Sequence, residues 1–262
     1  MQRKLPPGLT EKVFNEAMAA MRGIVGKRWV FTDAQSGVKS YRDPYFIVEE
    51  DRFEPSAAIA PANVEQVQEV VKVANQYGVP LWPISTGKNL TYGGPAPRLP
   101  GTVMLDLKRM NRILEVNEEF GYALVEPGVS YFDLYEYLQL NNMKLWIDCA
   151  SPGWGSVLGN TMDRGVGYTP YGDHFMMQCG MEVILADGSL VRTGMGALPN
   201  NNTWQLFKYG YGPYLDGIFT QSNFGVVTKM GVWLMPEPPA YRPYLVTFPR
   251  ETDIENVVDI LR

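Results

Sequence analysis

A run of small polar residues and glycines between positions 84 and 94 has the composition of an anion-binding loop. It begins with Ser85-Thr-Gly-Lys-Asn89, directly after an apolar segment, and ends with Tyr92-Gly-Gly94. Consecutive backbone N–H groups and small hydroxyls in such a loop can bind a phosphate or a diphosphate. The pattern is neither a Walker A loop nor a GxGxxG dinucleotide motif. The local sequence leaves an ordinary surface turn open as the alternative.

Two further glycine-rich segments lie in the second half of the chain. Six glycines fall within the 20 residues from Gly153 to Gly172, shortly before His174, the only histidine. Glycine at this density is typical of backbone packed against something flat or bulky. A flavin ring and neighbouring protein side chains are both compatible with the spacing. In Phe219–Thr228, polar residues and Gly225 precede an apolar segment, as at the edge of a ligand site.

Composition excludes several kinds of function. The 262 residues are 45% hydrophobic and 19% charged, which is typical of a folded globular chain. The formal net charge of −5 argues against binding to nucleic acid. Cys149, Cys179 and His174 are too few for a four-ligand zinc site, and two reduced thiols are favoured over a single disulfide. We find neither an apolar run of about 18 residues, which a membrane-spanning helix needs, nor the pattern of a secretory signal.

Periodicity and end signals predict an α+β fold. Thr10 and Asn63 are candidate N-caps of amphipathic helices, and Ser130 with Asp133 begins another helix that runs to Leu140. The helix after Asn63 lies between two predicted strands, as in a βαβ unit with parallel strands. The predicted strands are 56–61, 79–85, 102–107, 122–126, 181–185, 190–193, 226–234 and 244–248. The last strand follows a proline-rich break, precedes a predicted helix at 253–261, and has the character of the start of another domain.

The sequence resembles the FAD-dependent 4-phenol oxidising flavoproteins, the vanillyl-alcohol oxidase / p-cresol methylhydroxylase family. The resemblance extends from Leu5 to Asp259, and five stretches in the same order carry it. They are Ser85-Thr-Gly-Lys-Asn89, Val125-Glu-Pro-Gly128, Gly159-Asn-Thr-Met-Asp-Arg-Gly-Val-Gly-Tyr-Thr-Pro-Tyr-Gly172, Arg192-Thr-Gly-Met-Gly196, and Thr220-Gln-Ser-Asn223 with Gly225. The resemblance implies an N-terminal arm (1–50), a small α/β FAD subdomain (51–115), a larger α+β FAD subdomain (116–239), and the start of a cap domain (240–262).

The resemblance also implies which residues contact FAD. The loop 85–89 would hold the diphosphate through its backbone amides, and the other stretches would line the rest of the cofactor. The implied contacts are Ser85, Thr86, Gly87, Lys88, Asn89, Gly93, Pro127, Gly128, Gly159, Asn160, Thr161, Gly165, Gly167, Tyr168, His174, Gly225, Val226 and Val227. The covalent flavin link of the family usually involves the cap domain, so that role is not assigned to His174. No metal site is expected.

Two residues receive catalytic roles from the resemblance. Tyr92 falls where the family has a tyrosine that hydrogen-bonds the phenolate oxygen of the substrate. Loss of a hydride from the benzylic carbon leaves a p-quinone methide, and a hydroxyl donor at that oxygen stabilises the changing charge. Ser151 stands where the oxidases of the family have an aspartate, and a serine cannot act as the base that a carboxylate provides. Asp148 would replace this aspartate only if the loop rearranged.

These features favour the hydroxylase branch of the family. Gly172–Gly180 and Asn202–Gln205 also resemble that branch, which passes electrons to a cytochrome c-type acceptor. The expected reaction is hydroxylation of a para-alkylated phenol. The alternatives are an oxygen-using oxidase and a non-catalytic FAD-binding fragment. The expected partners are the phenol, the electron acceptor and a cap domain or second chain, in a homo-oligomer when full length. The expected location is the cytoplasm, or the periplasm by export with a partner.

Overall fold

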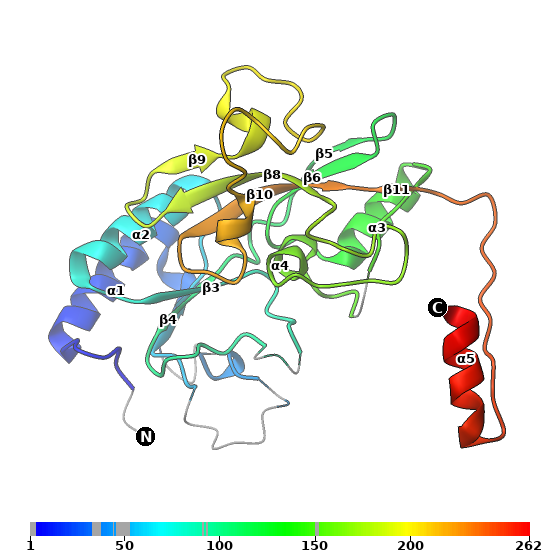
Figure 1. Cartoon of the computed structure of the whole chain (residues 1–262). Coiled ribbons are helices and arrows are strands. Elements are labelled where there is room, and N and C mark those ends of the chain that lie inside the picture. Colours follow the sequence, from blue (N-terminus) through cyan, green and yellow to red (C-terminus); the bar gives the residue numbers. More distant parts are fainter. Residues whose placement is uncertain are drawn as a thin grey trace.

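Two β-sheets with different strand directions organise the body of the chain (Figure 1). The structure is a computed structural model that describes residues 4–32, 38–43, 45, 53–90, 92, 94–149 and 152–262. The two sheets and the helices packed on them form two large hydrophobic cores, and Tyr41, Ala58 and Met104 form a third, smaller cluster. This arrangement confirms the α+β class expected from the sequence.

The first unit is an α/β layer with short strands. Its elements are α1 (Glu11–Val25), β1 (Val30–Phe31), β2 (Ala57–Ile59), α2 (Val64–Tyr77), β3 (Leu81–Ile84) and β4 (Val103–Asp106). The helix starts follow the predicted caps: the Thr10 and Asn63 side chains accept hydrogen bonds from the third residue of each helix. Gly78 ends α2 in the left-handed conformation. The apolar faces of α1 and α2 pack together in the first core, so the N-terminal segment belongs to this core.

The sheet of the first unit has the strand order β1-β2-β4-β3. Strands β2 and β3 are parallel, as the βαβ pattern predicts, but they do not pair with each other. Strand β4 lies between them and pairs in parallel with both. All four residues of β4 are buried, which suits the centre of a parallel sheet. The carboxyl ends of β2, β3 and β4 therefore meet at one edge, where the 85–89 loop begins.

The second unit is an antiparallel sheet covered by α3 and α4. Its elements are β5 (Ile113–Asn117), β6 (Tyr122–Val125), α3 (Tyr131–Leu140), β7 (Leu145–Trp146), α4 (Val157–Met162), β8 (Gln178–Leu185), β9 (Leu190–Arg192), β10 (Gly225–Trp233) and β11 (Met235–Pro236). The main sheet has the order β5-β6-β10-β8-β9, and β7 pairs separately with β11. A reciprocal capping box of Ser130 and Asp133 starts α3. The predicted antiparallel character is confirmed.

Helix α2 joins the two units through the turn between β8 and β9. Gln68 Nε2 donates to the Gly188 carbonyl at 2.9 Å, and Asn75 Nδ2 donates to the Ala186 carbonyl at 2.5 Å. Gly188 has φ of +85° at this turn, a conformation that favours glycine. Ile184 of β8 belongs to the first core. These contacts tie the edge of the second sheet to the first unit.

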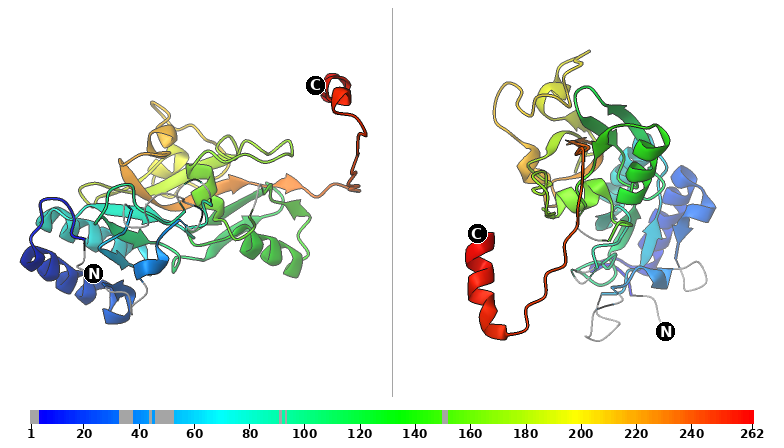
Figure 2. Two further views of the ribbon diagram at one scale, coloured as in Figure 1. Left: turned by 90° about the horizontal axis from the view of Figure 1, so that it is seen from below. Right: turned by 90° about the vertical axis from the view of Figure 1, so that its right-hand side faces the viewer.

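The C-terminal segment leaves the body after β11. A T-shaped contact between Trp146 and Tyr241 marks the exit, and α5 (Ile254–Leu261) stands apart from both sheets (Figures 1 and 2). The helix predicted at 253–261 is confirmed. The strand predicted at 244–248 is wrong, because this segment runs outside both sheets and has no neighbouring strand there. Within the described ranges, no helix combines the length and apolar character required to cross a membrane.

Candidate functional site

Residues 85–89 follow the carboxyl end of β3 and carry polar groups without partners among the residues that the structure describes. Among the described residues, the backbone N–H groups of 86–89 have no hydrogen-bond acceptor. Thr86 Oγ1 is buried and also lacks a described partner. Gly87 has φ of +68°, which a residue with a side chain rarely adopts. Polar groups left unsatisfied in this way are suited to bind an anionic ligand.

Neighbouring elements hold both ends of this loop. Leu107 N donates to the Ile84 carbonyl at 2.9 Å, which continues the pairing of β3 with β4. The Asn89 carbonyl accepts from Tyr92 N at 3.2 Å and from Gly94 N at 2.9 Å. The loop is therefore anchored before Ser85 and at Asn89, while the amides between these anchors stay open.

Two other predicted segments approach the loop from the second unit. A Cβ atom on Gly159 would lie 2.1 Å from Ser85 Oγ, so glycine lets α4 approach the loop closely. Ser156 Oγ, which caps α4, donates to the Pro127 carbonyl at 2.6 Å. A Cβ atom on Gly128 would lie 2.5 Å from the Lys108 carbonyl oxygen, just beyond β4. The structure thus brings the predicted segments 85–89, 127–128 and 159–161 together.

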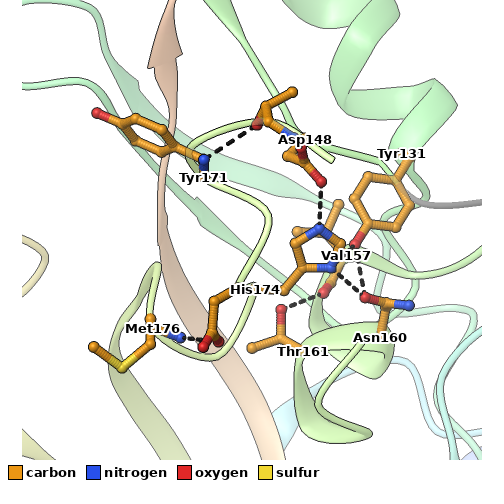
Figure 3. A network of polar contacts seen from close by, with 10 residues as sticks. Tyr131, Asp148, Val157, Asn160, Thr161, Tyr171, His174 and Met176 are labelled. Carbon is orange, nitrogen blue, oxygen red and sulfur yellow. Dashed lines mark hydrogen bonds and ion pairs between the residues drawn. The ribbon is translucent and has the colours of Figure 1, made fainter. Parts of the chain in front are cut away.

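A buried polar network surrounds His174 on the other side of α4 (Figure 3). His174 Nε2 lies 2.7 Å from Asp148 Oδ1, and His174 Nδ1 lies 2.5 Å from Asn160 Oδ1. The Tyr131 hydroxyl lies 3.2 Å from both His174 Nδ1 and Asn160 Oδ1. Thr169 N donates to Asp148 Oδ2 at 3.0 Å. The network therefore joins α3, the segment after β7, α4 and the glycine-rich loop through polar side-chain contacts.

Glycines 165 and 167 are needed because this network fills the space beside them. A Cβ atom on Gly165 would lie 2.0 Å from Asn160 Oδ1, and one on Gly167 would lie 1.4 Å from Asp148 Oδ1. Of the two explanations that the spacing left open, packing against protein side chains accounts for these two glycines. His174 and the Asn160 carboxamide are likewise occupied within the protein.

The network also determines the charge state of its acid. Burial by itself would raise the pKa of Asp148, but hydrogen bonds from Thr169 and His174 outweigh this effect and lower the pKa below its ordinary value. Burial raises the pKa of the Tyr131 hydroxyl, so this group stays protonated. Asp148 is thus an ionised, fully engaged carboxylate. Both of its oxygens have partners, His174 on Oδ1 and Thr169 N on Oδ2.

The other predicted residues lie in several environments. Tyr92 follows the loop with 77% of its surface exposed, and Tyr168 is 95% exposed. The Thr161 hydroxyl donates to the Val157 carbonyl of its own helix. Gly225, Val226 and Val227 begin β10, and the two valine side chains pack in different cores. Gly93 and Ser151 lie outside the described residues.

Three observations concern cysteines, metals and overlooked residues. Cys149 and Cys179 are free thiols, as favoured from the sequence. The described residues contain no group of three or more potential metal ligands. Sequence reasoning did not assign Tyr131 or Asp163 to the site, because Tyr131 lies outside the recognised stretches and Asp163 lies within one without an implied role. The only signal for Asp163 was its place between Gly159 and Gly165, in a stretch already singled out.

Comparison with known proteins places this geometry in a family. The model of the FAD binding domain matches residues 55–194. The 4-cresol dehydrogenase [hydroxylating] flavoprotein subunit of Pseudomonas putida is 51% identical over 98% of this chain and 50% of its own length. The 1'-carboxy-chondrochloren decarboxylase of Chondromyces crocatus is 37% identical over 94% of this chain and 45% of its own. The chain spans about half the length of these curated relatives.

Solved structures agree with this assignment. A crystal structure of p-cresol methylhydroxylase with substrate bound matches 99% of this chain and 50% of its own, with 51% identity and a TM-score of 0.95. The 4-ethylphenol oxidase from Gulosibacter chungangensis matches 98% of this chain and 49% of its own, with 46% identity and a TM-score of 0.92. The glucose dehydrogenase Phl p 4.0202 shares the fold, with 20% identity and a TM-score of 0.61.

The residues present fit the cofactor of this family. The open amides of 86–89 and the unpartnered Thr86 hydroxyl are donors of the kind that a diphosphate accepts from. Glycines 128 and 159 allow close backbone approach around that loop. The matched model covers the loop, both glycines and the buried network. The chain belongs to the FAD binding domain family, and its cofactor is FAD.

Proposed function

We propose that the chain is the flavin-binding part of an oxidoreductase that hydroxylates para-alkylated phenols. The 51% identity to a 4-cresol dehydrogenase flavoprotein subunit over 98% of the chain carries the proposal. When bound, FAD would supply the acceptor for the hydride that the benzylic carbon of the substrate loses. The substrate loses its phenolic proton as well and becomes a p-quinone methide. Addition of water to this species gives the 4-hydroxyalkylphenol.

The loop residues hold the cofactor in this proposal. Backbone amides of 86–89 and the Thr86 hydroxyl donate to the diphosphate oxygens, and hydrogen bonds to charged acceptors are stronger than those to neutral ones. Gly128 and Gly159 let the segment after β4 and the Ser85 side chain pack closely, so that segments 127–128 and 159–161 lie beside the cofactor loop. The Asp148–His174 network keeps the glycine-rich loop in place beside α4 and contributes no proton to the reaction.

Tyr92 has a role toward the substrate in this proposal. It follows the diphosphate loop, and its side chain is exposed. Its hydroxyl donates a hydrogen bond to the phenolate oxygen, which holds the reactive ionised form of the substrate in place. Replacement of Tyr92 by phenylalanine removes this donor and leaves the ring.

The electron acceptor in our proposal is a cytochrome c-type protein. The relative from Pseudomonas putida is called a flavoprotein subunit, which implies a partner subunit in that protein. Ser151 offers no carboxylate at the position of the acid in the oxidases, and Asp148 is occupied by His174 and Thr169. An oxygen-using oxidase is the second candidate, because the 4-ethylphenol oxidase structure is 46% identical.

Residues 240–262 begin a substrate (cap) domain in our proposal. Their apolar side chains face solvent: Leu245 is 92% exposed and Leu261 is 80% exposed. Exposed apolar surface of this kind is normally covered by another part of a protein. The cap would complete the phenol pocket beside Tyr92.

The test is an anaerobic reduction of the full polypeptide loaded with FAD. Addition of 4-methylphenol or 4-ethylphenol should bleach the visible flavin band, and Tyr92→Phe should slow the bleaching at least about tenfold. An added cytochrome c should then restore the band faster than air does. Rapid reoxidation by air would favour the oxidase candidate. A flavin band that neither phenol bleaches would contradict the proposed substrate class.

A further inference from the structure

Residues 162–164, at the end of α4, connect two glycine-containing segments that are far apart in the sequence. Asn89 Nδ2, in the diphosphate loop, donates to Asp163 Oδ2 at 2.8 Å. On the other side, Gln221 Nε2 donates to the Asp163 carbonyl at 3.1 Å, and Gln221 N donates to the Met162 carbonyl at 3.2 Å. Asp163 therefore contacts the 85–89 loop with its side chain and the 217–223 segment with its backbone.

Arg164 fixes the second of these connections. Its guanidinium donates to the buried Thr220 Oγ1 at 2.9 Å from Nη2 and 3.2 Å from Nε. The Thr220 hydroxyl in turn donates to the Gly217 carbonyl at 2.8 Å. Contacts with residues 217–223 thus fix the positions of residues 163 and 164. The Asp163 carboxylate is therefore already in place to accept a hydrogen bond from Asn89.

The backbone at this junction adopts an uncommon conformation. Arg164 has φ of +56° and Gln221 has φ of +48°, and both are outside the region that residues with side chains usually occupy. Such conformations persist only where surrounding contacts enforce them, and they concentrate at ligand and active sites. Here Arg164 and Gln221 lie close together, because Arg164 bonds to Thr220 and Gln221 bonds to the Asp163 carbonyl.

The diphosphate loop needs an external support because it has few bonds of its own. The amides of 86–89 have no described acceptors, and the Asn89 carbonyl is the loop's anchor to Tyr92 and Gly94. The Asn89 carboxamide adds an anchor outside the loop, on Asp163. A loop that is ordered before its ligand arrives loses less conformational entropy on binding.

We propose that Asp163 is a positioning residue for FAD, which acts by holding Asn89 and thereby pre-organising the diphosphate loop. This inference rests on the assignment of residues 85–89 as the diphosphate site. Asp163 contributes an acceptor for the Asn89 amide. Its negative charge does not favour FAD binding, because a carboxylate and a diphosphate repel each other. The proposal therefore predicts different results for removal of the acceptor and removal of the charge.

The experiment is a double-mutant cycle read out as FAD affinity, by quenching of flavin fluorescence in the FAD-binding chain. Asp163→Ala should weaken FAD binding about fivefold to tenfold, the size expected for one lost hydrogen bond. Asp163→Asn keeps an acceptor oxygen without the charge and should bind FAD as tightly as the unaltered chain or more tightly. Asn89→Ala should weaken binding at least as much as Asp163→Ala.

The double variant Asn89→Ala/Asp163→Ala distinguishes positioning from a general structural effect. If Asp163 acts through Asn89, the double variant should bind no more weakly than Asn89→Ala. A matched control is Asp187→Ala, which removes a carboxylate that accepts from Ser189 in the turn between β8 and β9. This control should change FAD affinity less than twofold. Urea unfolding without FAD should show that all variants fold.

Several outcomes would overturn the proposal. Unchanged affinity in a folded Asp163→Ala variant would do so, as would additive losses in the double variant. A loss in Asp163→Asn as large as in Asp163→Ala would show that charge is the important property. If every variant binds FAD with one affinity and riboflavin binds as tightly as FAD, the loop is not the diphosphate site. That result overturns the assignment on which the inference rests, whereas the first three leave that assignment intact.

Discussion

The two glycine-rich segments beside α4 look alike in composition and differ in what their polar groups contact. In residues 85–89 the amides and the Thr86 hydroxyl lack partners among the described residues. In residues 159–174 the polar side chains of Asn160 and His174 bond within a network that also takes in Asp148 and Tyr131. One segment is open to a ligand, and the other is closed around its own side chains.

This difference explains two uses of glycine. In the open loop, Gly87 allows a left-handed turn that leaves neighbouring amides free. In the closed segment, Gly165 and Gly167 make room for Asn160 and Asp148. Glycine density alone therefore does not identify the ligand site. What marks the ligand site is the combination of a buried hydroxyl without a partner, on Thr86, and four neighbouring amides without described acceptors.

The largest expected effect comes from adding a methyl group to the closed segment. In Gly167→Ala the new Cβ would lie 1.4 Å from Asp148 Oδ1, so the buried Asp148–His174 pair must separate. We expect a loss of about 3–5 kcal/mol in the free energy of unfolding, measured in urea. The control is Gly217→Ala, where the nearest atom lies 4.0 Å away, on Phe175. Equal stabilities for the two variants would show that the network is not closed.

A smaller effect on stability is expected when the Asp148 carboxylate is replaced by a neutral amide. Asp148→Asn should lower the free energy of unfolding by about 2–3 kcal/mol at pH 7. The pKa of Asp148 is lowered in the folded chain, so its contribution is present above the unfolded-state pKa of about 3.9 and is lost as pH falls through the folded-state pKa. The two proteins should therefore converge in stability once pH falls below the folded-state pKa of Asp148. A difference that persists or grows in acid would contradict this role of the Asp148 carboxylate.

The smallest expected effect is a loss of FAD affinity without a loss of folding stability. Thr86→Val removes a buried hydroxyl that has no described partner, so the free energy of unfolding without FAD should stay the same or rise by up to about 1 kcal/mol. FAD affinity should fall about fivefold, because the diphosphate loses a donor. Urea unfolding and fluorescence titration measure the two quantities. A variant less stable than the unaltered chain but equal in FAD affinity would place Thr86 with the closed segment.

Local signals predicted much of the fold. The caps at Thr10, Asn63 and Ser130 and most strands of both sheets follow from patterns within a few residues, but the strands β1 and β5 were not predicted. The insertion of β4 between β2 and β3 depends on pairing across the sheet, which no local pattern specifies. Helix α4 was missed because it has six residues and includes Gly159, although Ser156 was available as a cap signal.

The open part of the site was easier to predict than the closed part. Loop 85–89 is contiguous, so its small residues and glycine indicated anion binding directly. The Asp148–His174 bond spans 26 positions, and the Asn89–Asp163 bond spans 74. Such pairs form only when the chain folds and brings distant segments together, and the Asn89–Asp163 bond also requires the two units to meet. The sequence therefore named His174 as a residue of interest without its partner.

Hydrogen–deuterium exchange with and without saturating FAD tests the contrast between the two segments most directly. Amides of 86–89, which lack described acceptors, should exchange rapidly in the free chain and slow at least about tenfold when FAD is added. The Gly167 and Gly172 amides already donate to carbonyl oxygens at 2.8 and 2.9 Å, and their exchange should change little. Protection of residues 165–172 with no change at 86–89 would contradict the account.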